Sequence, residues 1–478
     1  MISLNHSYFF VPFKVDSLDI WKTTVESTRY INKKGDELGV WKRIVDTLPV
    51  HLMKYVNDGV GYNTERQYAY ELCEKREYGI PYTDGKKKIL KTTLKRNEKV
   101  LEVEFDISHI RMHMFGTGIG ILVYDISYSD EMDYESILEF NYQFKKMGID
   151  KFMIENCQVD RKEKMPFMYK LSQNIISCNS ACLTETEIFF NAVSKVKMQA
   201  NVFCILSDST TDNIDNKLFH LARAYNSDYQ YSEYAESSGI TIYNPYSYVH
   251  WGYCEQGIAC VYNDVCKFTH NQLPGNLQND YYFMYLILLH QRYMLLDLMD
   301  KTLICKKGSI SEWKKIQESL LDFEIEYSFN VISDEMTYHK IYSDMRSKLS
   351  VIELENDIND VSNRMYVLNQ EEKKKCANEI HEQEEVSADI RSRRTDIVLG
   401  LLSLLAIFSA LVDSTDVINE WCSKDDKVTL LWPHFLSYGI IGIVTLVVVC
   451  FLIHSYLQYR KIKKKIRIRG ENKWNQKR

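Results

Sequence analysis

The sequence predicts an α/β cytosolic domain, followed by a long helical stalk and a two-helix transmembrane hairpin. Three observations lead to this fold class. Short apolar or alternating segments, typical of strands, recur up to residue 265. Residues 335–394 contain neither Gly nor Pro and therefore predict one very long helix. Two apolar runs, 397–412 and 435–457, stand near the end of the chain.

The first 265 residues indicate a sheet with helices mixed in. The segments that we expect to be strands are Tyr8–Val15, Val100–Ile107, His109–Phe115, Gly118–Ser127, Asn201–Asp208, Ile240–Tyr243, Tyr248–Tyr253 and Gly257–Tyr262. Apolar spacing predicts helices over Asp133–Met147 and Asn213–Tyr225, and a shorter one through Leu38, Trp41, Val45 and Leu48 that Pro49 would end. The basic stretch Lys86–Lys99 is expected to be a solvated turn.

A glycine cluster, FGTGIG, separates two of the predicted strands. Gly116, Gly118 and Gly120 could let the backbone approach a phosphate, or they could form a tight turn. A strand follows the cluster, whereas phosphate-binding loops lead into a helix, so the turn is favoured.

Helices follow the sheet. Tyr281–Leu303 is strongly apolar, but it contains His290, Gln291, Arg292 and Asp297, which would be costly at the centre of a bilayer. We therefore expect a helix buried among neighbouring helices and not a third membrane span. Further helices are predicted over Ser309–Tyr327 and Glu335–Arg394. The last contains a heptad seam, typical of a coiled coil, through Val351, Leu354, Ile358, Val361, Met365 and Leu368.

The two apolar runs predict membrane-spanning helices at 395–418 and 435–457, because a span needs about 20 mostly apolar residues. Basic residues stand before the first run and after the second, and the loop between them is acidic. Positive flanks stay in the cytoplasm, so we expect a multi-pass protein of the inner or plasma membrane with both termini cytoplasmic. The basic tail, 458–478, is interpreted as a lipid-headgroup anchor and not as a nucleic-acid site.

The first predicted span carries a line of small and polar residues at steps of three and four. A single helix cannot enclose a channel, so several copies would have to place this line around a shared pore. Asp413 and Asp416 would form acidic rings at the outer mouth. The alternative is that the line is only a helix–helix contact. The candidate pore-lining residues are Asp396, Leu399, Ser403, Ala406, Ala410, Asp413 and Asp416.

Composition excludes several function classes. The formal net charge is -6, which does not indicate a nucleic-acid-binding protein. The 12 Cys are scattered in a chain that begins without a signal-peptide pattern, so reduced thiols are expected. His109 and His113 share a strand face with Arg111 between them, and a satisfied pair is favoured over a metal site. The chain contains no familiar catalytic motif, so we do not expect an enzyme.

In the order of its elements, the chain resembles the CorA-like two-span metal-ion channels over essentially its whole length. The resemblance implies a homopentamer whose first span lines the pore. The family's Gly-Met-Asn signature is absent, because the corresponding place reads Val412 to Asp416, VDSTD. The predicted parts are then 1–265 as the α/β domain, 266–394 as the stalk, 395–418 and 435–457 as spans, 419–434 as the outer loop and 458–478 as the tail.

The strand pair FGTGIGILVYDIS and the helix YLILLHQRYMLL are similar to divergent CorA-like proteins found beside type III CRISPR systems. That resemblance implies an antiviral effector gated by a nucleotide messenger, such as a conjugate of S-adenosylmethionine with AMP (SAM-AMP), bound by the cytosolic domain. Two alternatives remain: a constitutive divalent-cation transporter, Mg²⁺-like, and a non-conducting membrane-anchored binding module. Residues 116–120 and 243–262 are the candidate ligand contacts, and no other cofactor is expected.

Overall fold

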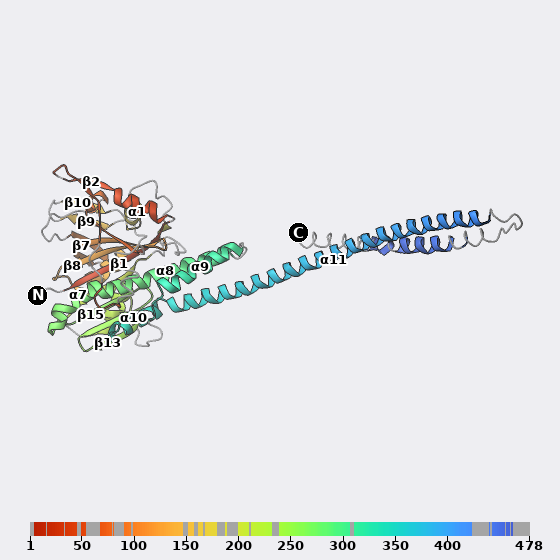
Figure 1. Cartoon of the computed structure of the whole chain (residues 1–478). Coiled ribbons are helices and arrows are strands. Elements are labelled where there is room, and N and C mark those ends of the chain that lie inside the picture. The colour runs from red at the N-terminus through yellow and green to blue at the C-terminus, as the bar shows by residue number, and fades with distance from the viewer. Residues whose placement is uncertain are drawn as a thin grey trace. The chain divides into compact units, whose positions relative to one another are not determined.

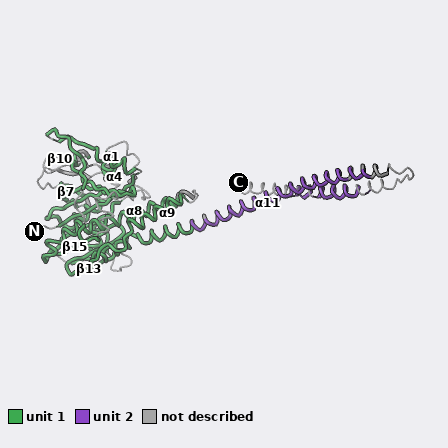
Figure 2. Tube along the Cα trace, viewed as in Figure 1, with its two compact units in different colours: residues 1–365 green, residues 366–478 purple. Residues whose placement is uncertain are grey.

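The computed structural model describes residues 4–461 with gaps, of which the longest are 54–66, 81–89, 179–186, 189–198, 232–238 and 423–438. The chain forms two compact units, residues 1–365 and residues 366–478 (Figure 2). The first unit contains all the strands named below and the helices that cover them.

The first unit is built on a mixed sheet of 13 strands (Figure 1). The main path through the sheet runs β10-β9-β6-β7-β8-β1-β12-β15-β14-β13, while β4, β5 and β11 pair off this path. The strands are β1 (Asn5–Lys14), β4 (Trp41–Arg43), β5 (Gln67–Leu72), β6 (Leu90–Arg96), β7 (Lys99–Phe115), β8 (Ile119–Tyr128), β9 (Phe152–Asn156), β10 (Arg161–Met165), β11 (Glu187–Ile188), β12 (Asn201–Ser207), β13 (Thr241–Tyr246), β14 (Val249–Tyr253) and β15 (Gly257–Tyr262). A separate hairpin joins β2 (Arg29–Ile31) to β3 (Glu37–Gly39).

Helices cover both faces of this sheet, so its central strands are buried on both sides. One apolar core, here the α3-side core, lies under α1 (Leu18–Ser27), α3 (Tyr134–Lys145), α4 (Met168–Ile176) and α5 (Ile214–Arg223). The other, the α8-side core, lies under α8 (Tyr282–Ile304), α9 (Ile310–Glu326) and α10 (Met336–Lys348). Burial on both faces explains the nearly continuous apolar sequence of β1, YFFVPF.

Most of the predicted strands and helices in the first unit are confirmed. Asp133 begins α3 as predicted, because its carboxylate accepts a hydrogen bond from the Ser136 N–H at 2.9 Å. The glycine cluster is a tight turn: Gly118 has φ +83° and its N–H donates to the Phe115 carbonyl at 3.0 Å. A Cβ on Gly120 would lie 2.2 Å from the Phe13 ring, so close packing of strand against side chain also requires glycine there.

Three local predictions are wrong. The short helix through Leu38 and Trp41 is replaced by β3 and β4, because pairing of β4 with β5 outweighs local helical spacing; Val45 and Leu48 lie outside the described residues. Part of the basic stretch Lys86–Lys99 is a strand, β6, paired along its length with β7. The strands predicted on either side of Ser108 are one strand, β7, which a bulge at this residue interrupts without ending it.

The predicted helix over Glu335–Arg394 is two helices. α10 ends at Lys348, and α11 (Val351–Cys422) begins two residues after Leu349. Between them Ser350 adopts a left-handed conformation with φ 54°, which turns the chain without Gly or Pro. Half of the predicted heptad seam packs inside the first unit, because Val351 and Ile358 are fully buried in the α8-side core and Leu354 packs against it.

The predicted transmembrane hairpin is contradicted. Within the part of the chain that the structure describes, no helix is both long enough and apolar enough to cross a membrane. The run Ile397–Val412 is part of α11 and lies between Asp396 and Asp413, which leaves about 24 Å of apolar helix against the roughly 30 Å of a bilayer's hydrocarbon. The predicted multi-pass location in the inner or plasma membrane is therefore corrected as well.

Candidate functional site

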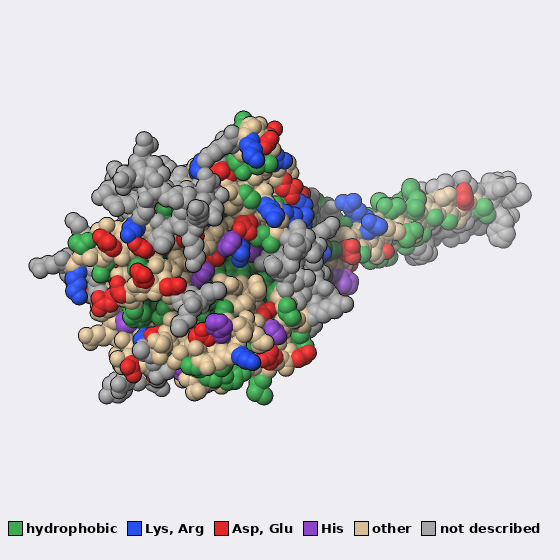
Figure 3. Space-filling view, turned by 90° about the vertical axis from the view of Figure 1, so that its left-hand side faces the viewer, with side chains coloured by type: hydrophobic (Ala, Val, Ile, Leu, Met, Phe, Trp, Pro, Cys, Tyr) green, Lys and Arg blue, Asp and Glu red, His purple; other side chains and the backbone are tan. Residues whose placement is uncertain are grey.

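The α8-side face of the sheet carries a group of charged side chains at the end of the sheet where β1 begins. These residues come from β1, β5, β7, β8 and the short helix η1 (Lys75–Tyr78). Figure 3 shows single histidine side chains spread among acidic and basic ones on one face of the molecule. We call the group the sheet-face cluster, and it consists of His6, Glu71, Lys75, Asp106, His109, Arg111 and Asp125.

Strand register brings this cluster together. Asp125 on β8 lies opposite Tyr8 on β1 and opposite His109 on β7, so the three residues form one row across three strands. Glu71 on β5 lies opposite Arg111 on β7. Because directly opposed residues point to the same face of a sheet, residues separated by more than 100 positions share one surface.

Two histidine–carboxylate pairs hold the ends of the cluster. His6 Nδ1 lies 2.9 Å from Asp125 Oδ1, and His109 Nδ1 lies 2.5 Å from Glu71 Oε1. The hydrogen bond from His109 lowers the pKa of the Glu71 carboxyl. The Asp125 side chain is only 7% exposed, whereas the His109 side chain is 42% exposed. The cluster therefore has a buried floor and a side that solvent can reach.

Lys75 fills the bulge in β7. Its ammonium group donates to the carbonyls of Ile107 and Ser108, the residues at which the register shifts. Burial lowers the pKa of this ammonium, and burial raises the pKa of the nearby Asp106 carboxyl. Ser108 Oγ lies 2.9 Å from Ser127 Oγ on β8, which fixes the bulge from the other side.

The donors in this cluster suit an oxyanion. A guanidinium presents its N–H groups in a planar fork that matches phosphate, and imidazolium groups donate from both nitrogens. Each histidine uses Nδ1 for a carboxylate, and its Nε2 makes no hydrogen bond with the described residues. Among these residues, no group of three or more His, Cys, Asp or Glu is placed to hold a metal ion.

The cluster is joined to the start of α8 through His113 and Tyr282. His113 is fully buried; its Nε2 lies 2.7 Å from the Tyr282 hydroxyl, and its Nδ1 lies 3.5 Å from the Gln67 amide. Burial lowers the pKa of His113 to about 3, so the ring is neutral at pH 7. The Arg111 guanidinium carbon lies 5.9 Å from the centre of the Tyr282 ring. A ligand that contacts Arg111 would therefore also act on the first residue of α8.

Further along α8, His290 contacts the glycine turn. Its Nε2 lies 2.9 Å from Thr117 Oγ1, and its ring stacks on Phe115 with a centroid distance of 3.8 Å. The ring is completely buried, which lowers its pKa to about 3, and its Nδ1 has no hydrogen-bond partner among the described residues. The residues predicted as ligand contacts at 116–120 thus lie against the helix that was predicted to be buried.

The next two residues of α8 contact the elements that lead into α11. The Gln291 amide donates to the Tyr327 carbonyl and lies 3.2 Å from the Tyr342 hydroxyl. Arg292 donates to the Leu349 carbonyl, at the corner between α10 and α11, and pairs with Glu255 at 2.6 Å. The polar residues inside this apolar helix therefore contact the glycine turn, the α9–α10 loop and the α10–α11 corner in succession.

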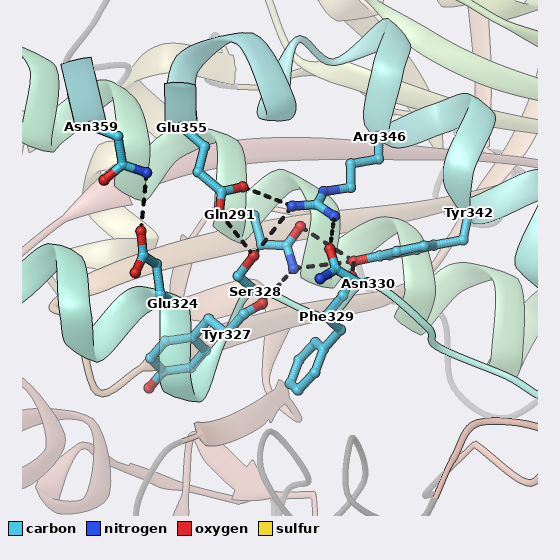
Figure 4. A network of polar contacts seen from close by, with 10 residues as sticks. All are labelled: Gln291, Glu324, Tyr327, Ser328, Phe329, Asn330, Tyr342, Arg346, Glu355 and Asn359. Carbon is cyan, nitrogen blue, oxygen red and sulfur yellow. Dashed lines mark hydrogen bonds and ion pairs between the residues drawn. The ribbon is translucent and has the colours of Figure 1, made fainter. Parts of the chain in front are cut away.

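A buried polar network locks this corner (Figure 4). Arg346 of α10 donates to Glu355 of α11 at 2.7 Å and to Asn330 at 2.8 Å. The Tyr342 hydroxyl donates to the Phe329 carbonyl at 2.8 Å. One turn further along α11, Asn359 donates to Glu324 of α9 at 3.0 Å. Hydrogen bonds from α9 and α10 therefore hold the first turns of α11, and α8 contacts the α9–α10 loop and α10 beside them.

The predicted pore-lining residues all lie on α11, in the second unit. Those whose side chains are described are exposed, and the Ser403 hydroxyl donates to the Leu399 carbonyl one turn earlier at 2.8 Å. The side chain of Asp416 lies outside the described residues. The exposed or half-exposed predicted residues are Asp396, Leu399, Ser403, Ala406, Ala410 and Asp413.

The aromatic stretch 243–262, predicted as a ligand contact, is mainly core. Trp251, Tyr253 and Tyr262 are buried in the α8-side core, and only Tyr246 of this stretch is a large exposed aromatic residue. Sequence reasoning missed the sheet-face cluster, although His109 and Arg111 had been noticed. The available signal was the run Asp106–Arg111, in which charged and apolar residues alternate on a predicted strand.

Comparison with known proteins adds no relative. The chain matches no protein-family model, and neither the curated proteins nor the solved structures include a significant match to it.

Proposed function

We propose that residues 1–365 form a sensor for a phosphate-bearing small molecule, with a nucleotide messenger as its leading candidate, and that α8 passes binding on to α11. The observation that carries the proposal is the double attachment of α8. Its first residue contacts the sheet-face cluster through His113 and Arg111, and its Gln291 and Arg292 hold the elements around the α10–α11 corner.

The chemistry of the cluster supports this class of ligand. Arg111 provides N–H donors beside two carboxylate-oriented histidines, on a surface that is half open to solvent.

The wider role is that of a self-assembling effector. The homo-oligomer, the SAM-AMP type of messenger and the setting in type III CRISPR antiviral defence all come from the family resemblance, and they are part of the proposal. The proposal does not include passage across a membrane, and it does not include the cation transporter that would depend on it. CRISPR genes next to the gene for this chain would support the setting, and native mass spectrometry would count the subunits.

The direct test is calorimetric titration of the full chain with ATP, AMP, S-adenosylmethionine, SAM-AMP and inorganic phosphate. We expect at least one nucleotide to bind saturably, and Arg111→Gln to weaken it at least tenfold. Arg43→Gln is the matched control, because Arg43 is an exposed arginine on β4 outside the cluster and should not change the affinity. Absence of saturable binding by every probe, or equal loss in both variants, would refute the proposal.

The proposed coupling of ligand binding through α8 to α11 is tested separately. Arg292→Ala should leave ligand affinity within about twofold, because Arg292 is outside the cluster. It should abolish any ligand-dependent change in amide hydrogen exchange at residues 346–358, since it removes the contact with the Leu349 carbonyl. A ligand-dependent change that is as large in Arg292→Ala as in the unmodified chain would exclude α8 as the route.

A further inference from the structure

A second group of side chains, outside the sheet-face cluster, combines tyrosines with cations. It lies where the C-terminal ends of α3 and α5 meet the loop 224–231, on the side of the sheet that holds the α3-side core. We call it the tyrosine–cation cluster, and it consists of Tyr142, Lys145, Lys146, Arg223, Tyr225 and Tyr229.

The three tyrosines form a continuous aromatic surface. Tyr225 and Tyr229 are stacked, with ring centroids 4.2 Å apart and planes inclined by 26°. Tyr142 lies beside Tyr229 at 5.8 Å, and their hydroxyl oxygens are 3.2 Å apart. Tyr229 is 41% exposed, so the surface ends in a ring that solvent can reach.

Three basic side chains surround these rings, and burial lowers the pKa of one of them, Lys145, to about 7. Lys146 Nζ lies 3.3 Å from the centre of the Tyr142 ring, and Lys145 Nζ lies 4.5 Å from that of Tyr225. The guanidinium carbon of Arg223 lies 5.5 Å from the same Tyr225 ring. Cations over aromatic faces are attracted by the ring quadrupole, so the cluster concentrates positive charge beside flat apolar surface.

The loop that presents Tyr229 is held in place from two sides. Buried Glu139 of α3 accepts a hydrogen bond from the Asn226 amide at 3.0 Å. Buried His220 of α5 lies with Nε2 2.7 Å from the Tyr229 carbonyl. Ala224, with φ 45°, ends α5 in the left-handed conformation and starts the loop. These contacts mean that the exposed ring is fixed before any ligand arrives, which reduces the entropy cost of binding.

We propose that the tyrosine–cation cluster binds a planar, negatively charged ligand of the nucleoside monophosphate class. The base stacks on the exposed face of Tyr229, and Lys146 and Arg223 neutralise the phosphate. Stacking on a fixed aromatic ring tolerates any base, and the adjacent cations supply the preference for an anion. This site is independent of the proposed sensor site.

The test uses AMP, adenosine and ribose 5-phosphate as probes, titrated by calorimetry into the full chain carrying Arg111→Gln, which silences the sheet-face cluster. We expect saturable AMP binding, with adenosine and ribose 5-phosphate each at least tenfold weaker. Tyr229→Ala should weaken AMP at least tenfold, and Tyr229→Phe should retain it because the ring remains. Tyr246→Ala is the matched control: Tyr246 is also 41% exposed and stacks on another tyrosine, but it is not part of the cluster.

The outcomes separate this proposal from the sensor. Loss of all AMP binding in the Arg111→Gln background assigns the signal to the sheet-face cluster and refutes the second site. Equal isotherms for Tyr229→Ala and Tyr246→Ala refute it as well. Binding that survives Arg111→Gln and is lost in Tyr229→Ala supports it, whatever happens to the sensor. Far-UV circular dichroism of each variant confirms that the fold is intact.

Discussion

Two apolar helical stretches in this chain have opposite surroundings. In α8, Leu286, Leu288 and Leu289 are 0% exposed, because the sheet, α9 and α10 surround the helix. In α11, Leu401, Leu402 and Leu405 are 46%, 56% and 65% exposed. The sequences are similarly rich in Leu, yet only one stretch contributes to the core of the unit that contains it. An apolar sequence alone therefore does not make a helix buried. Burial also requires neighbouring elements that pack against it.

The largest expected effect comes from placing a charge in each stretch. Leu286→Asp should cost about 5 kcal/mol or more in the free energy of unfolding of the first unit, because it buries an unpaired carboxylate. Leu405→Asp adds the same charge at an exposed position and should leave that free energy unchanged within about 0.5 kcal/mol. Urea unfolding followed by tryptophan fluorescence measures both. Similar losses in the two variants would mean that the two stretches do not differ as described.

A smaller effect should separate the ion pairs of the two regions. Arg346 and Glu355 form a pair whose side chains are 9% and 19% exposed, so Arg346→Ala should cost about 3–5 kcal/mol by leaving a carboxylate unpaired. Arg393 and Asp389, on α11, are 35% and 52% exposed, so Arg393→Ala should cost less than about 0.5 kcal/mol. The same unfolding assay applies, and a double-variant cycle with Glu355→Gln isolates the pair. A loss below about 1 kcal/mol for Arg346→Ala would show that the corner is not locked.

The last expected effect is a pH dependence that only the buried region should show. His113 and His290 have pKa values lowered to about 3 by burial, against about 6.5 in an unfolded chain. Between about pH 6.5 and pH 3, these two histidines are protonated in the unfolded state and neutral in the folded state. Stability is therefore complete above about pH 6.5 and falls towards pH 3, by about 1.4 kcal/mol per pH unit for each histidine.

Substitution identifies the histidines responsible for this slope. His113→Gln and His290→Gln should each make the fall in unfolding free energy between pH 6.5 and 4.5 shallower. His381→Gln, at an exposed position on α11, should not change it. Unfolding free energies measured at half-unit pH intervals give the comparison, and an unchanged slope in both buried variants would contradict it.

Sequence-based prediction was more successful for the first unit than for the second. Periodicity identified β1, α3, β12 and α8, because each has a pattern that its neighbours preserve. It missed the break at Ser350, since a left-handed serine leaves no signal comparable to Gly or Pro. It also missed the sheet-face cluster, because strand register, which the sequence does not state, brings His6 beside Asp125. The transmembrane prediction was wrong because it rested on apolarity alone.

The position of β1 has a consequence for how the chain is made. This strand is synthesised before β8 and β12, yet it lies between them in the finished sheet. At about 5–20 residues per second, its first partner emerges several seconds to about 20 seconds later. During that interval the segment YFFVPF has no strand to pair with, so nascent chains would need a chaperone's protection there, and slow codons before residue 128 would lengthen the exposure.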